Sequence, residues 1–151
     1  VYQFLADNTG MGIKEITDVL NKQSGLLGIS ELSNDCRTIE EEAAKGHEGA
    51  KLALEIFTYR LAKYVASMAV AAGGLDVLAF TGIGENSDVV RAKVLGYCEF
   101  LGLKLDNNAN LAARFGKAGV ITTADSPAVA VVIPTNEELM IAQDTALLSG
   151  L

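Results

Sequence analysis

The sequence has few of the residues that mark disulfide-rich, zinc-binding or nucleic-acid-binding proteins. Its two cysteines, Cys36 and Cys98, are too few and too far apart for a disulfide framework or a thiolate zinc site. Twelve basic residues stand against nineteen acidic ones, and the net charge of −7 disfavours capture by nucleic acid or by an anionic membrane. Both cysteines fit a reducing compartment. We therefore expect a cytoplasmic protein with no nucleic-acid and no membrane partner.

Long apolar runs and a leader segment are missing as well. The longest weakly polar stretch, residues 65–75, contains Ser67 and two glycines, and it falls well short of the roughly 20 apolar residues of a membrane-spanning helix. The chain begins with Val1 and shows no basic n-region, so no signal peptide is predicted. A start in mid-pattern indicates a fragment. With 151 residues, half of them apolar, the chain can bury a core and is predicted to form one domain over residues 1–151.

The chain does contain alternating helical and strand patterns. Apolar residues from Leu54 to Met68 recur at helical spacing and predict a long, largely buried helix that ends at Gly73-Gly74. The unbroken apolar run at residues 77–80 predicts a strand that is covered on both faces. Strands that alternate with helices indicate an α/β fold with a substantially parallel core.

The remaining elements are predicted from shorter patterns. They are a helix over residues 13–20, a loop over 25–30, strand candidates at 103–105 and 129–133, a helix from Ser87 as N-cap to Leu101, and a last helix that starts with Thr135 and Glu138 at capping-box spacing.

A glycine turn from Thr81 to Ser87 lies where the strand at residues 77–80 passes into the next helix. Glycine lets the main chain approach a ligand oxygen, and main-chain N–H groups at the start of a helix favour an anion. The spacing leaves two interpretations open. The turn is either a phosphate site or a tight connection that binds nothing.

A dinucleotide site is a further alternative for the same turn. Gly82, Gly84 and Ser87 approximate the dinucleotide-binding glycine pattern, and Asp106 follows at about the distance of a ribose-binding acid. This would make the protein a Rossmann-type NAD-dependent dehydrogenase. Against it, serine replaces the third glycine, and Glu85 would bring a carboxylate next to the pyrophosphate.

Four segments in order resemble the sequence motifs of acetate kinases, and the resemblance extends over nearly the whole chain. The segments are Ser24-Gly25-Leu26-Leu27-Gly28-Ile29-Ser30, Ser33-Asn34-Asp35-Cys36-Arg37, the stretch from Asp76 to Arg91 around Thr81-Gly82-Ile83-Gly84-Glu85-Asn86-Ser87, and Val132-Ile133-Pro134-Thr135-Asn136-Glu137-Glu138-Leu139-Met140-Ile141-Ala142.

The resemblance implies an actin/Hsp70/sugar-kinase-like (ribonuclease H-like) fold with a mixed sheet flanked by helices. It also implies the C-terminal, nucleotide-binding domain of a two-domain homodimeric enzyme. Such enzymes use ATP and Mg²⁺ to convert acetate into acetyl phosphate and ADP. By resemblance, the metal ligand is Glu137, and the nucleotide-binding residues are Asp35, Cys36, Arg37, Gly82, Ile83, Gly84, Glu85 and Asn86.

Taken without the resemblance, several of these residues have simpler interpretations. Glu137 near a helix start is favoured by the helix dipole alone. Asp35 is typical of a turn, and Arg37 in a polar turn is ordinarily solvated. The single histidine, His47, is predicted to be exposed and not catalytic.

The chain departs from the family in two ways. The family pattern is Thr-Gly-Gly-Ile-Gly-Glu-Asn, and this chain has one glycine fewer before Ile83, which puts the roles of Gly82 and Ile83 in question. The catalytic Asp, Arg and His residues of the family belong to its N-terminal domain, and none has a counterpart here. We therefore expect no catalytic residue in this chain and no turnover by it. A non-catalytic dimerisation fragment is the other alternative, with the alanine-rich helix face that includes Ala62, Ala66, Ala69 and Ala72 as a candidate surface.

Overall fold

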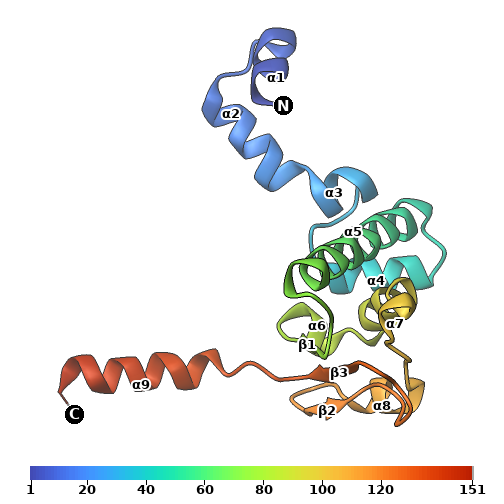
Figure 1. Cartoon of the computed structure of the whole chain (residues 1–151). Helices are drawn as coiled ribbons and strands as arrows, with labels where there is room; N and C mark the ends of the chain where they lie inside the picture. Colours follow the sequence, from blue (N-terminus) through green and yellow to red (C-terminus); the bar gives the residue numbers. More distant parts are fainter. Residues whose placement is uncertain (151) are drawn as a thin grey trace. The chain divides into compact units, whose positions relative to one another are not determined.

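The computed structural model describes residues 1–150, and the chain divides into two compact units, Val1–Tyr64 and a second that begins at Val65. The regular elements of the first unit, among its described residues, are all helical. Its elements, coloured blue to green in Figure 1, are α1 (Tyr2–Thr9), α2 (Ile13–Asp18), the π-helical turn η1 (Val19–Gln23), α3 (Gly25–Ser30), α4 (Cys36–Ala44) and the first part of α5 (Glu48–Ala72).

Two short elements of this unit differ from the sequence predictions. The helix predicted over residues 13–20 is α2, continued by η1. The loop predicted over residues 25–30 is wrong, because this segment forms α3. At Gly28, an added Cβ would lie 2.8 Å from the Gln23 carbonyl oxygen. This glycine therefore serves close packing of one short turn against the preceding one.

The long helix α5 is confirmed, but only one of its sides is buried. His47 is exposed, as predicted, and its Nδ1 accepts a hydrogen bond of 3.1 Å from the Ala50 N–H at the helix start. Of the alanines on the predicted face, Ala62 and Ala69 are buried in the chain, Ala66 is half-buried and Ala72 is exposed, so only part of this face is open. Met68, by contrast, is 61% exposed, which makes the prediction of a largely buried helix wrong.

The second unit contains a three-stranded mixed sheet in the order β1-β3-β2 (Figure 1). Strands β1 (Val77–Phe80) and β3 (Val129–Val132) are parallel, and β2 (Gly119–Val120) is antiparallel to β3. The helical elements of this unit are α6 (Ile83–Asn86), α7 (Asp88–Tyr97), the 3-10 turn η2 (Glu99–Leu101), α8 (Asn107–Ala112) and α9 (Glu137–Ser149). The predicted α/β class with a mixed sheet flanked by helices is thus confirmed.

One face of the sheet is buried and the other is open within the described chain. Phe80, Ala130 and Val132 are at most 6% exposed, whereas Val77 is 58% exposed. The prediction that the first strand is covered on both faces is therefore wrong. The candidate strand at residues 103–105 forms only isolated bridges at its two ends.

Helix α7 begins as predicted, because the Ser87 Oγ accepts a hydrogen bond of 3.0 Å from the Val90 N–H. Its side chains Val90, Val94 and Leu95 are at most 1% exposed and fill the core. Among residues 1–150, no helix is both long and apolar enough to cross a membrane.

Candidate functional site

The two motifs of the second unit leave the sheet at the same edge. Phe80 and Val132, the last residues of the parallel strands β1 and β3, are register partners, and the Ile133 N–H donates to the Phe80 carbonyl at 3.0 Å. In open α/β sheets, ligands bind outside the carboxyl ends of such strands. The glycine turn and the segment that leads to Glu137 therefore both start where a ligand site is expected.

The shortened glycine turn closes without distortion. Gly82 has φ 56° and ψ −121°, which match the first central position of a type II′ turn, and the Gly84 N–H donates to the Thr81 carbonyl at 3.0 Å. Only glycine adopts this conformation readily. Within residues 1–150, the main-chain N–H groups of Gly82 and Ile83 have no hydrogen-bond partner. The turn thus presents two N–H donors from which a phosphate oxygen could accept hydrogen bonds.

Gly84 has a packing function. A Cβ at this position would lie 3.0 Å from the Phe80 ring. The glycine therefore lets α6 lie against the end of β1. This packing is what the interpretation of the turn as a tight connection requires.

Glu85 joins the two motifs, although the residues concerned are 50 positions apart in the chain. Its carboxylate accepts hydrogen bonds from the Thr135 N–H at 2.6 Å and from the Thr135 Oγ1 at 3.2 Å. The predicted capping box is therefore wrong, because Thr135 is held by Glu85. The N-cap of α9 is Asn136, whose Oδ1 accepts from the Leu139 N–H at 3.0 Å.

Arg91 has a role that sequence reasoning missed. Its side chain is fully buried, and its Nη1 donates to the carbonyls of Gly84 at 2.7 Å and Glu85 at 3.0 Å. Asn110 of α8 accepts from the guanidinium through its Oδ1 at 2.7 Å and its carbonyl at 2.6 Å. The guanidinium thus fixes α6 to α7 and α8. The available sequence signal was an arginine on the otherwise apolar face of a helix.

Asn86, the last of the predicted loop residues, is tied to a later segment. Its Oδ1 accepts a hydrogen bond of 3.2 Å from the Phe115 N–H. The Nδ2 of the same side chain is its donor group, and the residue is exposed.

Glu137 is suited to be one ligand of a metal ion. It is exposed at the start of α9, and its carboxylate has no hydrogen-bond or ion-pair partner in the described part of the chain. Mg²⁺ prefers hard oxygen ligands and commonly takes one or two carboxylates together with water and phosphate oxygens. The described residues contain no group of three or more His, Cys, Asp or Glu side chains that could hold a metal by themselves. The chemistry of this carboxylate therefore fits Mg²⁺ held jointly with a nucleotide.

The predicted residues of the first unit lie at the start of α4. Asp35 is the N-cap and accepts from the Arg37 N–H at 2.8 Å, while the Arg37 Nη2 lies 2.9 Å from its other oxygen. These bonds to Arg37 lower the pKa of Asp35 to about 2. Cys36 is buried, and its burial raises the pKa of the thiol to about 12. Asp35 and Arg37 thus remain as the exposed charged groups of this motif.

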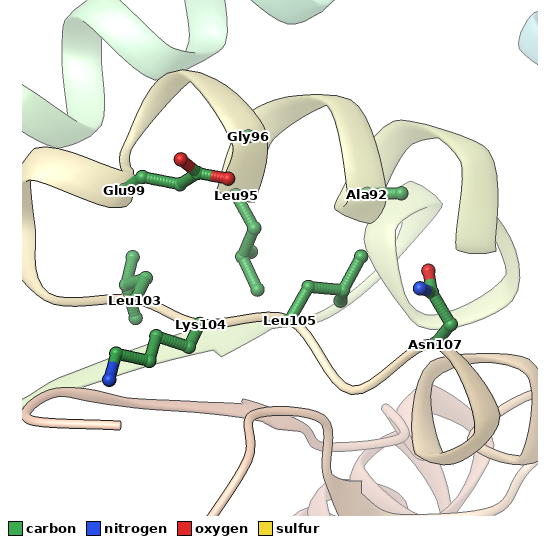
Figure 2. Close-up of a pocket in the computed structure, with 8 residues that line it drawn as sticks. All are labelled: Ala92, Leu95, Gly96, Glu99, Leu103, Lys104, Leu105 and Asn107. Carbon is green, nitrogen blue, oxygen red and sulfur yellow. The ribbon is translucent and has the colours of Figure 1, made fainter. Parts of the chain in front are cut away.

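Two other features bear on the alternatives. Asp106, the candidate ribose acid, caps α8 through hydrogen bonds from the N–H groups of Asn108 at 2.9 Å and Ala109 at 3.0 Å. A cavity of about 580 Å³ lies between α7 and residues 103–107. In Figure 2, Leu95 and Leu105 extend into this space and Glu99 lies at one end of it. None of the predicted site residues is among its lining residues.

The fold and the glycine turn define the chain as part of an actin/sugar-kinase-like protein, and comparison with known proteins gives the family. The Acetokinase family matches residues 1–143. Acetate kinase 1 of Neisseria meningitidis (strain MC58) is 76% identical over the whole chain, which covers 38% of that protein. Acetate kinase of Chromobacterium violaceum is 66% identical over the whole chain and 38% of its own length. The chain belongs to the acetokinase family.

Solved structures agree with this assignment. Acetate kinase of Porphyromonas gingivalis superposes with a TM-score of 0.87 at 43% identity, covering 97% of this chain and 37% of that one. A propionate kinase of Francisella tularensis gives a TM-score of 0.84 at 45% identity, over 94% and 36% of the two chains. The chain thus spans less than two fifths of the length of these relatives. Nothing in the part of the chain that the structure describes favours the dehydrogenase alternative.

Proposed function

We propose that this chain is the C-terminal, nucleotide-binding part of an acetate kinase, a phosphotransferase that makes acetyl phosphate and ADP from acetate and ATP. The observation that carries the proposal is the meeting of two motifs at one sheet edge, where Glu85 of the glycine turn holds Thr135 two residues before Glu137. Phosphoryl transfer requires alignment of the phosphates and neutralisation of their charge. The turn and the free carboxylate are suited to these two tasks.

The proposed nucleotide contacts are those of the two matched motifs. Gly82 and Ile83 offer main-chain donors to the phosphates, and Gly84 to Asn86 complete the loop. Asp35 to Arg37 are proposed to contact the adenosine part. Glu137 would hold Mg²⁺, which supplies positive charge against the phosphate oxygens. The proposal treats residues 1–151 as one nucleotide-binding domain of a two-domain, cytoplasmic enzyme, in keeping with the free thiols of both cysteines.

A homodimer is part of the same proposal. Exposed apolar side chains at helical spacing on α5 support it, because a row of this kind is typical of a surface that another protein chain covers. The row consists of Leu52, Ile56 and Tyr59.

Separate titrations with ATP and with NAD, each with and without Mg²⁺, test the proposed function. We expect ATP-selective binding that Mg²⁺ strengthens, measured by NMR chemical-shift changes so that weak affinities are covered. Selective NAD binding would overturn the proposal. We also expect no ATP consumption by the chain alone with acetate and Mg²⁺, and measurable acetate-dependent turnover would contradict that part.

A further inference from the structure

The contact between Glu85 and Thr135 links the two halves of the candidate site. We infer that Glu85 is a positioning residue that couples the glycine turn to the metal-binding carboxylate of Glu137, and that it does not itself bind the nucleotide. The inference rests on the proposed function and refines it, because it assigns Glu85 a different task from its neighbours in the turn.

The Glu85 carboxylate is already engaged by Thr135. Both of its oxygens lie within hydrogen-bond distance of Thr135, at 2.6 Å from the main-chain N and 3.2 Å from Oγ1. A carboxylate also repels the negative charge of a phosphate. Its partner and its charge therefore both point away from direct contact with the triphosphate.

Glu85 holds the segment that leads from β3 to α9. Ile133 is fixed on one side by its bond to Phe80, and Thr135 on the other by Glu85, with Pro134 between them. The proline ring restricts φ at the middle residue. Asn136 then caps α9, whose first residue is Glu137. The main chain is thus fixed by the Glu85 contact only two residues before Glu137.

At the other end of the contact, Glu85 is itself held in place. The main chain of Glu85 is held by the buried guanidinium of Arg91, 3.0 Å from its carbonyl. A displacement of the glycine turn is therefore transmitted through the Glu85 carboxylate to Thr135 and the start of α9. Groups that orient a metal ligand in this way typically change metal affinity by about 10- to 100-fold when they are removed.

Glu85→Gln tests the coupling, because glutamine keeps the size of the side chain but loses one acceptor and the charge. In the wild-type chain, we expect Mg²⁺ to strengthen ATP binding. In E85Q, we expect this Mg²⁺ gain to fall by about tenfold or more, or to vanish. We expect the affinity for Mg²⁺-free ATP to stay within about twofold, because the two main-chain donors of the turn are unchanged.

Matched variants separate coupling from loss of folding. Thr135→Ser keeps both donors and should retain the Mg²⁺ gain, whereas Thr135→Val keeps only the N–H and should lose part of it. Glu99→Gln removes an exposed carboxylate elsewhere in the second unit and should change neither affinity. In spectra of the free protein, E85Q should shift the amide signals of Asn136 and Glu137, and E99Q should leave them in place.

Each result decides the matter. If E85Q weakens Mg²⁺-free ATP binding as much as Mg²⁺-ATP binding, Glu85 is a nucleotide ligand and the inference is wrong. An unchanged Mg²⁺ gain, or unshifted Glu137 signals in E85Q, would also overturn it. If the wild-type chain binds no ATP at all, the proposed function fails, and the spectra of the free protein still decide whether Glu85 sets the start of α9.

Discussion

Gly82 is the residue on which the geometry of the shortened turn depends. Its φ of 56° with ψ of −121° lies in a region that side chains other than hydrogen rarely permit, although nothing lies within 4 Å of an added Cβ. Gly82→Ala should therefore lower the free energy of unfolding by about 1–3 kcal/mol through backbone strain alone. Urea unfolding followed by circular dichroism measures the change.

Gly96 provides the matched control for this substitution. It lies within α7, also has nothing within 4 Å of an added Cβ, and does not have a positive φ. Gly96→Ala should stabilise the protein by up to about 1 kcal/mol, because alanine restricts the unfolded chain and suits a helix. If G82A has the same urea midpoint of unfolding as the wild type, the turn can adopt another conformation at no cost in free energy, and the prediction is wrong.

Asp35 carries a pH prediction at the same scale. The side-chain hydrogen bond from Arg37, followed by the bond from the Arg37 main-chain N–H, lowers the pKa of Asp35 from 3.8 to about 2 in the folded chain. Because the folded pKa is the lower one, the interaction stabilises the protein above about pH 4 and is lost as the pH falls through 2. The ¹³C shift of the Asp35 carboxyl group, followed from pH 1.5 to 6, should have its midpoint near 2.

Two variants check the cause of the low pKa. Arg37→Ala should raise the midpoint toward the ordinary value, and only part of the way because the main-chain N–H at residue 37 remains. Arg60→Ala, which removes a guanidinium from α5, should leave it unchanged. A wild-type midpoint close to 4 would mean that the pair with Arg37 does not persist in solution.

At the scale of elements, the second unit depends on the way Arg91 joins α6, α7 and α8. Arg91→Ala would remove this donor from the buried Asn110 Oδ1 and from the partly buried carbonyls of α6. Each unpaired buried group costs about 1–3 kcal/mol, so we expect a loss of about 3 kcal/mol or more in the free energy of unfolding. Arg91→Lys should lower the free energy of unfolding by less than Arg91→Ala does, but still measurably, because one ammonium group cannot reproduce the fork of a guanidinium.

Arg114 is the control for Arg91. It pairs with Asp88 at 2.6 Å but keeps a third of its side chain exposed. Arg114→Lys should change the free energy of unfolding by about 1 kcal/mol or less. Equal losses in R91K and R114K would contradict the role given to the buried guanidinium.

Local patterns in the sequence predicted the elements whose stability is also local. Helix α5, the strand at Val77–Phe80 and the Ser87 cap all depend on neighbouring residues, and each of these elements lies where it was predicted. Burial was predicted less well, because exposure of Val77 depends on what other elements cover the sheet. The segment Gly25–Ser30 was mistaken for a loop, since glycine there provides close approach and not a break.

The candidate site shows the same division. The family motifs identified the glycine turn and Glu137 from contiguous residues. The contacts that hold the site join residues far apart in the chain, such as Glu85 with Thr135 and Arg91 with Asn110. No short-range spacing encodes such pairs. Thr135 was therefore predicted to cap α9, although the carboxylate of Glu85 is the stronger partner for its donors.

At the scale of the whole molecule, the proposed nucleotide contacts fall into two groups that belong to different units. The group at residues 35–37 lies at the start of α4, and the group at 82–86 follows β1. If the first contacts adenosine and the second contacts phosphate, each should respond to the matching part of ATP alone. Adenosine should shift the amide signals of residues 35–37, and tripolyphosphate those of Gly82 and Ile83.

Complete ATP should shift residues 35–37 as adenosine does and Gly82 and Ile83 as tripolyphosphate does, because it carries both chemical parts. Titration of ¹⁵N-labelled chain with the three compounds measures this directly. Shifts at residues 82–86 alone, with tripolyphosphate binding as tightly as ATP, would mean that the chain recognises a polyphosphate and that the adenosine assignment of Asp35 and Arg37 is wrong.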